Sequence, residues 1–328
     1  MFTFGSDPEF MLKKGRMRSA IGIIPGSKHE RHDLGEHQCY YDNVLAECAV
    51  KPAGSKEETI ANFRDCLQRL SKLVAPHKLV CKAAHQYHPD ELQHEEAKKI
   101  GCDPEYCAYS LSEASPSNDT FKDGEVRLRT AGGHIHLGNE LLQEDEFAPI
   151  YATKMLDLFL AVPAVFLDGD PTARKRKELY GKAGRFRLPE HGVEYRSLSN
   201  FWLISPQFVG LVYDICEFVL EFLAEKRHFE FWTIDQETLE SDDAWNAEDF
   251  DPATCHRCTA YDVDGLRTAI DTHNRAKAKK YNDFAEDFLP SQIQDTILEL
   301  METWTADKWK TTTLTTSAMA EEWSLTSP

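Results

Sequence analysis

The sequence predicts an α+β fold in which helices accompany a sheet with one polar face. Three pairs of charged or imidazole side chains, spaced two residues apart in extended segments, indicate the sheet: Asp7 and Glu9, His134 and His136, and Glu194 and Arg196. Alternate residues of a strand point to the same face, so each pair shares one face. An amphipathic stretch at 56–74 and an apolar stretch at 206–226 indicate the helices.

The composition is that of a globular, acidic chain. Its 328 residues can bury a large core in one domain or two. The 37 basic and 55 acidic residues give a net charge of −18, which repels nucleic acid unless a local basic patch intervenes. We interpret the basic cluster between Arg174 and Arg196 as a pocket for a small polyanion, and we expect no nucleic-acid partner.

The cysteines and the apolar segments bear on the compartment. Nine cysteines, an odd number at irregular spacing, favour reduced thiols over a disulfide framework. No signal peptide opens the chain, and no apolar stretch is expected to reach the roughly 20 residues that span a bilayer. We therefore expect a cytoplasmic protein without a membrane partner.

The first strand is predicted over residues 1–12. It places Asp7 and Glu9 on one face, and Pro8 between them indicates a strand edge or a bulge. Two carboxylates aimed at one spot repel each other unless a cation lies between them. A solvated turn at Asp7 and Pro8 is the alternative interpretation.

The segment 13–36 is expected to form a hairpin and a polar loop. The extended segment 37–52 then carries two more acids, Asp42 and Glu47. Three histidines in and beside the loop are interpreted as surface residues or, at best, as substrate contacts: His29, His32 and His37.

The first helix is predicted over 56–74. Ser55 and Glu58 form a capping box, and apolar residues follow at helical spacing. A buried strand is expected over 79–84. Residues 88–124 are polar and irregular, with one short helix near their start.

The segment Gly132–Gly138 carries two histidines on one predicted strand, which the alternating run Glu125–Arg129 leads into. His134 and His136 share a face, and the paired glycines before them leave room for close approach to the backbone. Two imidazoles so placed suit a divalent metal or a phosphate. A half-exposed strand with two surface histidines is the alternative.

The rest of the chain alternates helices and polar segments. Helices are predicted over 146–160, 206–226, 262–288 and 290–304, with a turn at 168–171 and a strand around Glu194 and Arg196. We expect two parts, a core of residues 1–228 and a mainly helical extension of residues 229–328 packed on it. The end of the extension, from about residue 311, is rich in Thr and Ser and is expected to be poorly ordered.

Together, the polar pairs favour a site for metal ions and a nucleotide. Carboxylates with an imidazole suit Mg²⁺ or Mn²⁺, because these ions prefer hard oxygen ligands. Several arginines beside such ions suit a nucleoside triphosphate and a transferring phosphoryl group. The chain has no Gly-x-x-x-x-Gly-Lys-Ser/Thr motif, so we expect no P-loop.

Four motifs occur in a fixed order: Gly5–Phe10, Gly132–Gly138, Tyr180–Arg187 and Gly192–Arg196. In this order the chain resembles the phage-type amidoligases, also called COOH–NH2 ligases, over roughly residues 1–225. That family is related in fold to glutamine synthetase and γ-glutamylcysteine ligase. The resemblance implies a curved, mainly antiparallel sheet, a partial barrel around ATP with helices on its convex side. It also implies that ATP phosphorylates a carboxylate and that an amine attacks the acyl phosphate to give an amide.

The resemblance also implies roles for single residues. The metal ligands are expected to be Asp7, Glu9, Glu47, His134 and Glu194, with Asp7 standing where a glutamate is commoner. The residues expected to bind ATP or a substrate carboxylate are Arg174, Arg176, Lys182, Arg185 and Arg187. The residues expected to act on the phosphoryl group are Arg196, Arg185 and His136.

The implied substrates are a small-molecule or peptide carboxylate and amine, in the host cytoplasm if the chain is phage-encoded. Two other functions use the same residues: a small-molecule kinase of the same fold, and a catalytically silent binding or structural protein. A kinase needs no amine, and a silent protein would not bind ATP and Mg²⁺. Separately, four cysteines could bind zinc, although free thiols are favoured: Cys102, Cys107, Cys255 and Cys258.

Overall fold

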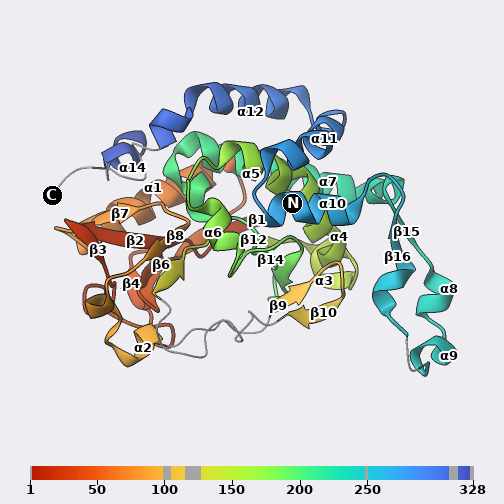
Figure 1. Ribbon diagram of the computed structural model, residues 1–328, viewed down its shortest axis with the longest axis horizontal. Coiled ribbons are helices and arrows are strands. Elements are labelled where there is room, and N and C mark those ends of the chain that lie inside the picture. The colour runs from red at the N-terminus through yellow and green to blue at the C-terminus, as the bar shows by residue number, and fades with distance from the viewer. Residues whose placement is uncertain (1, 99–104, 115–126, 248–249, 310–316, 326–328) are drawn as a thin grey trace.

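The computed structural model describes residues 2–98, 105–114, 127–247, 250–309 and 317–325 (Figure 1). A sheet of 12 strands runs through the described molecule, and all pairings between its named strands are antiparallel. Its main path is β10 (Ser112–Ala114), β9 (Glu105–Cys107), β13 (Arg185–Arg187), β14 (Gly192–Tyr195), β12 (Ile135–Gly138), β1 (Thr3–Ser6), β6 (Leu45–Ala53), β2 (Glu9–Lys14) and β3 (Arg16–Arg18).

Three further strands extend this path. They are β5 (His37–Asp42), which pairs with β6, β4 (His32–Leu34), which pairs with β5, and β7 (Lys78–Val80), which pairs with β2. The described strands do not close into a barrel. The α+β class and the large, mainly antiparallel sheet are confirmed.

The predicted first strand is two strands, β1 and β2, with Asp7 and Pro8 between them. Both pair with β6: Ser6 lies opposite Val50 and Glu9 lies opposite Glu47, in one antiparallel register. Pro8 still accepts a hydrogen bond at its carbonyl oxygen, from the Cys48 amide at 3.1 Å. The two strands are therefore halves of one strand interrupted at Asp7 and Pro8. The register shift lies between Phe4 and Ser6 and not at Pro8, where a strand edge or a bulge was predicted.

Helices cover one face of the sheet (Figure 1). The helices of this layer are α1 (Lys56–Leu73), α4 (Ala148–Leu156), α5 (Val162–Leu167) and α7 (Pro206–Ala224), with a π-helical turn, Asp157–Ala161, joining α4 to α5. The predicted capping box begins α1: the Ser55 hydroxyl accepts the Glu58 amide at 3.2 Å, and the Glu58 carboxylate accepts the Gly54 amide. Helix α1 packs on β6 and α7, and α4 packs on β14, so the core lies between sheet and helices.

The run Ala148–Leu167 is apolar and long enough, by composition, to cross a membrane. This corrects the expectation that no such stretch exists. Inside the fold, 89% of its most apolar stretch of 18 residues is buried, because the helix packs between the sheet and other helices. It is the only such helix in the described ranges, and its burial is that of a core helix.

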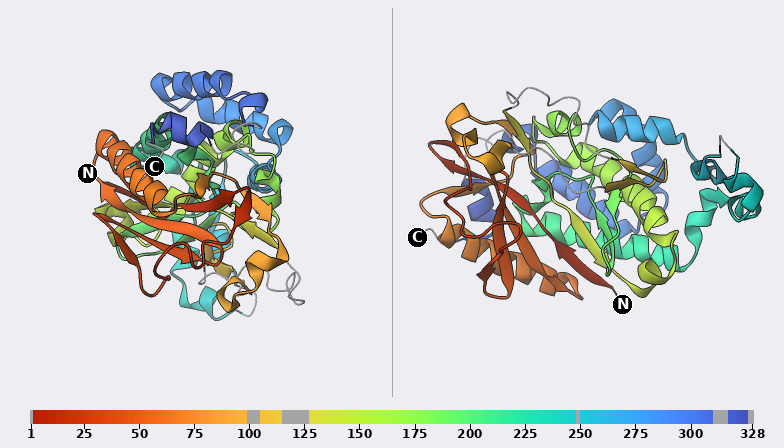
Figure 2. Two further views of the ribbon diagram at one scale, coloured as in Figure 1. Left: turned by 90° about the vertical axis from the view of Figure 1, so that its left-hand side faces the viewer. Right: turned by 90° about the horizontal axis from the view of Figure 1, so that it is seen from below.

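The C-terminal region begins with a hairpin at one end of the molecule, which Figure 1 and the right view of Figure 2 show projecting. Strands β15 (Trp232–Ile234) and β16 (His256–Cys258) pair there, and α8 (Gln236–Leu239) and α9 (Asp242–Trp245) lie in the segment that connects them. Three helices that pack against α5 or α7 follow: α10 (Val263–Asp271), α11 (Arg275–Glu286) and α12 (Ser291–Thr303). The single helix predicted over 262–288 is two, because His273 takes a left-handed conformation (φ 46°) between them.

The end of the chain differs from the prediction of a poorly ordered tail. Residues 310–316 and 326–328 lie outside the described residues, but Ser317–Glu322 forms a helix, α14. Next to it, Trp323 is fully buried, and its indole nitrogen donates to the Leu203 carbonyl at 2.9 Å. This part of the tail packs on the core.

The remaining elements are short. The helices are α2 (Glu95–Lys98), α3 (Glu140–Glu144), α6 (Ala173–Lys177) and four 3₁₀ turns, Pro89–Leu92, Asn200–Ile204, Arg227–Glu230 and Pro252–Cys255. Strands β8 (Ala84–Gln86) and β11 (Leu128–Thr130) pair in a separate sheet. The lead-in run before the histidines therefore belongs partly to another sheet, and its residues 125 and 126 lie outside the described residues.

Candidate active site

One row of residues crosses four neighbouring strands on the face of the sheet away from Tyr195. Gly5 of β1 lies opposite His136 of β12, and His136 lies opposite Glu194 of β14. Glu194 in turn lies opposite Arg187 of β13. Directly opposed residues share a face, so the register alone brings an imidazole, an acid and a guanidinium together. This is the polar face that the pairs in the sequence predict.

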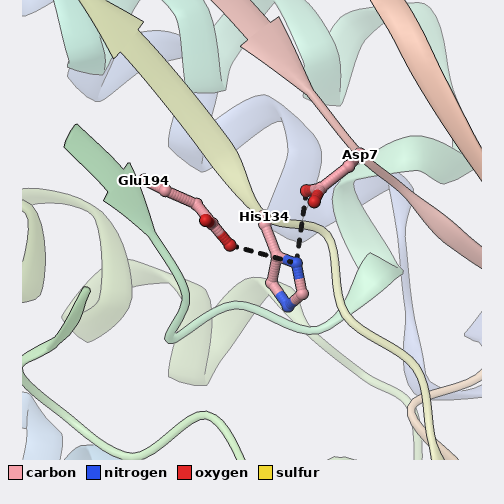
Figure 3. A group of neighbouring side chains, drawn as sticks. All are labelled: Asp7, His134 and Glu194. Atoms are coloured by element: carbon pink, nitrogen blue, oxygen red, sulfur yellow. Dashed lines mark ion pairs between the residues drawn. The ribbon is translucent and has the colours of Figure 1, made fainter. Parts of the chain in front are cut away.

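The first acidic group includes Glu194 of this row and consists of Asp7, His134 and Glu194 (Figure 3). His134 Nδ1 is 3.2 Å from Asp7 Oδ1 and 3.8 Å from Glu194 Oε1. His136 Nε2 is 3.1 Å from the same Asp7 oxygen. The two histidines therefore meet at Asp7 on one face, as their spacing predicts.

The second acidic group consists of Glu9, Asp42 and Glu47. Glu9 lies opposite Glu47, and Glu47 lies opposite Tyr40, so three adjacent strands bring these side chains to one face. The Tyr40 hydroxyl donates to Glu47 Oε1 at 2.6 Å. In each acidic group, one ligand atom per residue lies within 4.8 Å of the others, a spacing that one cation could bridge.

Burial makes this concentration of acids costly. It raises the pKa of Glu9 to about 8, with a further rise caused by Asp42, and it raises the pKa of Glu194 to about 7, with Asp7 contributing. Burial, helped by Asp7, also raises the pKa of Glu47 well above its ordinary value. A cation between the carboxylates would remove this mutual repulsion.

The pKa of Asp7 is shifted in the opposite direction. Burial alone would raise the pKa of Asp7, but His134 and His136 outweigh it and lower that pKa well below its ordinary value. Burial and the charge of Arg196 lower the pKa of His134 to about 3, which leaves a neutral imidazole. Neutral imidazole and ionised carboxylate are the states in which these side chains ligate metals.

Unpartnered atoms also point to an external ligand. Among the described residues, Asp7 Oδ1, His134 Nε2 and His136 Nε2 are buried without an aligned hydrogen bond. Buried polar atoms without partners are rare in proteins and cost free energy. The donor set and these orphan atoms therefore fit a divalent cation at the first acidic group, and the three carboxylates of the second group offer a donor set for another.

Arg196 lies at the centre of the basic side of the site. It is almost fully buried, and its guanidinium contacts Glu194 through Nη1 and Glu105 through Nε at 3.1 Å. Glu105 also lies 3.6 Å from Arg185 Nε, and Arg185 Nη1 is buried without a partner among the described residues. The face of Tyr180 lies 5.2 Å from the Arg196 guanidinium carbon.

The other predicted basic residues differ in placement. Arg176 is fully buried and donates to the carbonyl of Ser197, so it supports the backbone beside Arg196. Arg187 lies 3.6 Å from Glu194. Arg174 and Lys182 are exposed, and among the described contacts neither pairs with the acids of the site. The structure does not bring these two to the cluster.

The paired glycines are required by the protein's own side chains. A Cβ on Gly132 would collide with the His134 ring, and a Cβ on Gly133 would collide with Trp202. The Gly132 amide also donates to the Glu9 carboxylate, while its carbonyl accepts from the Glu9 amide at 3.0 Å. The close approach expected at this motif is thus filled by His134 and Trp202.

Sequence reasoning missed four residues that line or support the site: Tyr40, Glu105, Tyr180 and His191. Glu105 lies in a segment without alternation, and Tyr40 is an ordinary strand aromatic. The tyrosine inside the Tyr180–Arg187 motif was the one available indication. His37, expected at the surface, is buried, with Nε2 3.3 Å from Asp65.

The cysteines give no metal cluster in the described residues. Cys107, Cys255 and Cys258 are free thiols, and the two groups that could hold a metal ion contain no cysteine. Cys102 lies outside the described residues.

One comparison with known families gives a match. Residues 124–241 match the model of a family described as phage phiEco32-like COOH·NH2 ligase-type 2. This is the family that the four motifs resemble, and the match contains the histidine strand, the basic run and β14. No protein with a curated description matches the chain.

Proposed function

We propose that the protein is an ATP-dependent carboxylate–amine ligase that forms an amide or peptide bond through an acyl phosphate. The observation that carries the proposal is the meeting of two acidic groups, a neutral imidazole and buried arginines on one face of the sheet. The match of residues 124–241 to a family named for ligating COOH and NH2 groups supports it.

The two acidic groups would each hold one Mg²⁺ or Mn²⁺ ion. Asp7, His134 and Glu194 supply the first donor set, and Glu9, Asp42 and Glu47 supply the second. Bound beside a nucleotide, such ions neutralise phosphate charge. The protein orients these ligands through Tyr40, which donates to Glu47, and through the Gly132 amide, which donates to Glu9.

The arginines would bind the phosphates and the carboxylate that accepts the phosphoryl group. Arg196 and Arg185 are fixed by one shared acid, Glu105, so their guanidinium groups are oriented before substrate arrives. The unpartnered Nη1 of Arg185 remains free to donate to an anion. Arg187 lies close enough to Glu194 to act on the phosphoryl group as well.

A screen for condensation products tests the proposal. The protein would be incubated with ATP, MgCl₂ and a library of amino acids and short peptides, and mass spectrometry would detect products that equal two substrates minus one water. We expect at least one such product, with ADP and phosphate released in equal amounts. ADP formation with a phosphorylated product and no need for an amine would instead indicate a kinase. Absence of ATP and Mg²⁺ binding by calorimetry would indicate a silent protein.

A pair of variants ties any product to this site. Glu47→Gln changes a buried acid of the second group, whereas Glu144→Gln changes an exposed acid at the end of α3. Product formation should be lost in the first variant and kept in the second. A Glu47→Gln protein with unchanged turnover would contradict the assignment of the site.

A further inference from the structure

A hollow adjoins the acidic groups where the cross-strand row reaches Gly5. His136, Glu194 and Arg187 fill their positions in this row, but Gly5 has no side chain. The space above it is part of a cavity of about 380 Å³, large enough for a small ligand. Its lining includes Asp7, Arg31, Tyr40, Val50, Pro52 and His136.

Two groups of opposite charge line this hollow, Asp7 and the exposed Arg31. Arg31 lies over the ring of Tyr40, with its guanidinium carbon 4.8 Å from the ring centre. In the described part of the chain, no ion pair joins Arg31 to an acid, although acids outnumber bases in this protein. Asp7 also lines the hollow, and its side chain is 22% exposed although Oδ1 lies within 3.2 Å of both imidazoles, so its second carboxylate oxygen is the one left for a ligand. A guanidinium and a carboxylate that line one cavity suit a zwitterion.

The hollow is also lined by apolar residues. They are Val50 and Pro52 of β6, with Ala49. Two imidazoles complete the lining, and His136 Nδ1 lies 3.2 Å from His191 Nε2. The hollow therefore offers an aliphatic body apolar contacts beside a cationic and an anionic group.

The order of groups across the sheet assigns a direction to this ligand. Arg187 and Glu194 lie on one side of His136 in the row, toward the arginines of the site, and Gly5 lies on the other. A phosphoryl group bound by the arginines would leave its acyl partner near His136, with the hollow on the far side. A nucleophile would therefore enter from the hollow.

We infer that the hollow binds the amine substrate, an amino acid or short peptide with its amine at Asp7 and its free carboxylate at Arg31. This inference rests on the proposed ligase function. In the reaction, the ammonium group first gives one proton to solvent, the amine nitrogen then bonds to the acyl carbon, and the phosphate leaves with the electrons of its C–O bond. A second proton passes from this nitrogen to solvent, which leaves a neutral amide. Arg31 selects the substrate by its carboxylate and takes no part in the chemistry.

Binding measurements on the full-length protein test the inference without turnover. The probes are the twenty common amino acids and alanine-containing dipeptides, each paired with its C-terminal amide and measured by saturation-transfer NMR. We expect at least one probe to bind, and its amide to bind at least tenfold more weakly. Equal binding of acid and amide, or no binding by any probe, would overturn the inference.

Two variants locate the binding. Arg31→Gln should remove the preference for the acid over the amide, whereas Arg64→Gln, at an exposed position of α1, should keep it. Gly5→Ala should weaken binding severalfold, because the added methyl would lie 3.5 Å from His136 Cβ and 3.6 Å from Pro52, ordinary contacts that fill the hollow without a collision. Unchanged binding in both Arg31→Gln and Gly5→Ala would place the ligand elsewhere and overturn the inference.

Calorimetry with ATP and Mg²⁺ separates this inference from the proposed function. If ATP and Mg²⁺ bind but no probe binds, the hollow is misassigned and the ligase proposal stands. If a probe binds as expected but ATP does not, the ligase proposal fails while the binding site remains.

Discussion

Adjacent residues of β14 face two different environments. Tyr195 points into the helical layer, where its hydroxyl donates to Asp157 at 2.6 Å. Tyr109 donates to the same carboxylate at 3.0 Å. Glu194 points to the opposite face, where it lies beside Arg196 and His134. Both faces bury ionisable groups, but they satisfy them differently.

Asp157 is satisfied by the protein. Burial raises its pKa to about 6, although the hydrogen bonds from Tyr195 and Tyr109 oppose the rise. On the other face, burial leaves Glu9 with a pKa of about 8, and three polar atoms of the Asp7 and histidine cluster have no aligned partner. The difference teaches that a buried charge with complete internal partners is structural, whereas one without them indicates an external ligand.

The largest expected effect tests the polar face. Glu9→Gln should lower turnover by about 10³-fold or more, because the second acidic group loses a charged metal ligand. Its melting temperature without metal should stay the same or rise, because the replacement removes a carboxyl whose ionised form is destabilised by burial and by Asp42. Turnover assays and thermal melts measure the two outcomes.

Two results would contradict this contrast between the polar face and the helical face of the sheet. A Glu9→Gln protein with wild-type turnover would show that the polar face is not catalytic. A large fall in its melting temperature would show that Glu9 is structural, like Asp157. Glu144→Gln, at an exposed position, serves as the control and should change neither quantity.

The next effect concerns the arginine of the same face. Arg196→Lys keeps the charge but loses the fork that contacts Glu194 and Glu105 together. Because a planar guanidinium matches phosphoryl oxygens and an ammonium does not, turnover should fall by roughly 10²-fold, with a smaller change in KM for ATP. A kcat within a few-fold of wild type would make the Arg196 contacts a structural ion pair.

These contrasts show what the sequence could and could not predict. Alternation along a strand is local, so Asp7, Glu9, His134 and His136 were assignable to one face without a structure. Glu105 was not, because β9 has only three residues and its place is set by pairing with Arg185 and Phe186, some 80 residues later in the chain.

Counting basic residues in the sequence also overestimated how many of them lie at the site. Residues two apart on a helix point in nearly opposite directions, so α6 buries Arg176 and exposes Arg174. The packed end of the chain was missed for a related reason. Its composition is polar, and the burial of Trp323 depends on Leu203, which lies 120 residues earlier.

The third prediction addresses the helical face. Tyr195→Phe removes the donor to buried Asp157 and should lower the free energy of unfolding by about 1–3 kcal/mol. Turnover should change little, because the side chain points away from the acids. Tyr109→Phe, which removes the longer bond to the same carboxylate, is the matched variant and should cost less. A tenfold loss of turnover with unchanged stability would reverse the roles of the two faces.

The smallest effect is the pH dependence of metal binding on the polar face. The pKa of Glu9 is about 8 in the fold against an ordinary 4.5, so the folded protein keeps this proton more strongly than the unfolded chain does. Without metal, this carboxyl therefore lowers the free energy of unfolding as pH rises from about 4.5 through about 8.

A divalent cation competes with that proton. Below pH 8, each unit by which the pH falls should lower the affinity for Mg²⁺ by up to about tenfold, or roughly 1.4 kcal/mol, for each proton that the cation displaces. Calorimetric titrations with MgCl₂ at pH 6.5, 7.5 and 8.5 measure this slope.

Glu9→Gln should bind more weakly and show a shallower slope, because one titrating ligand is gone. Asp157→Asn, on the helical face, should leave the slope unchanged, because Asp157 meets the hydroxyls of Tyr195 and Tyr109 and no cation. An affinity that does not vary with pH in the wild-type protein would mean that the buried acids of the polar face are not the ligands, and the distinction between the two faces of β14 would lose its chemical basis.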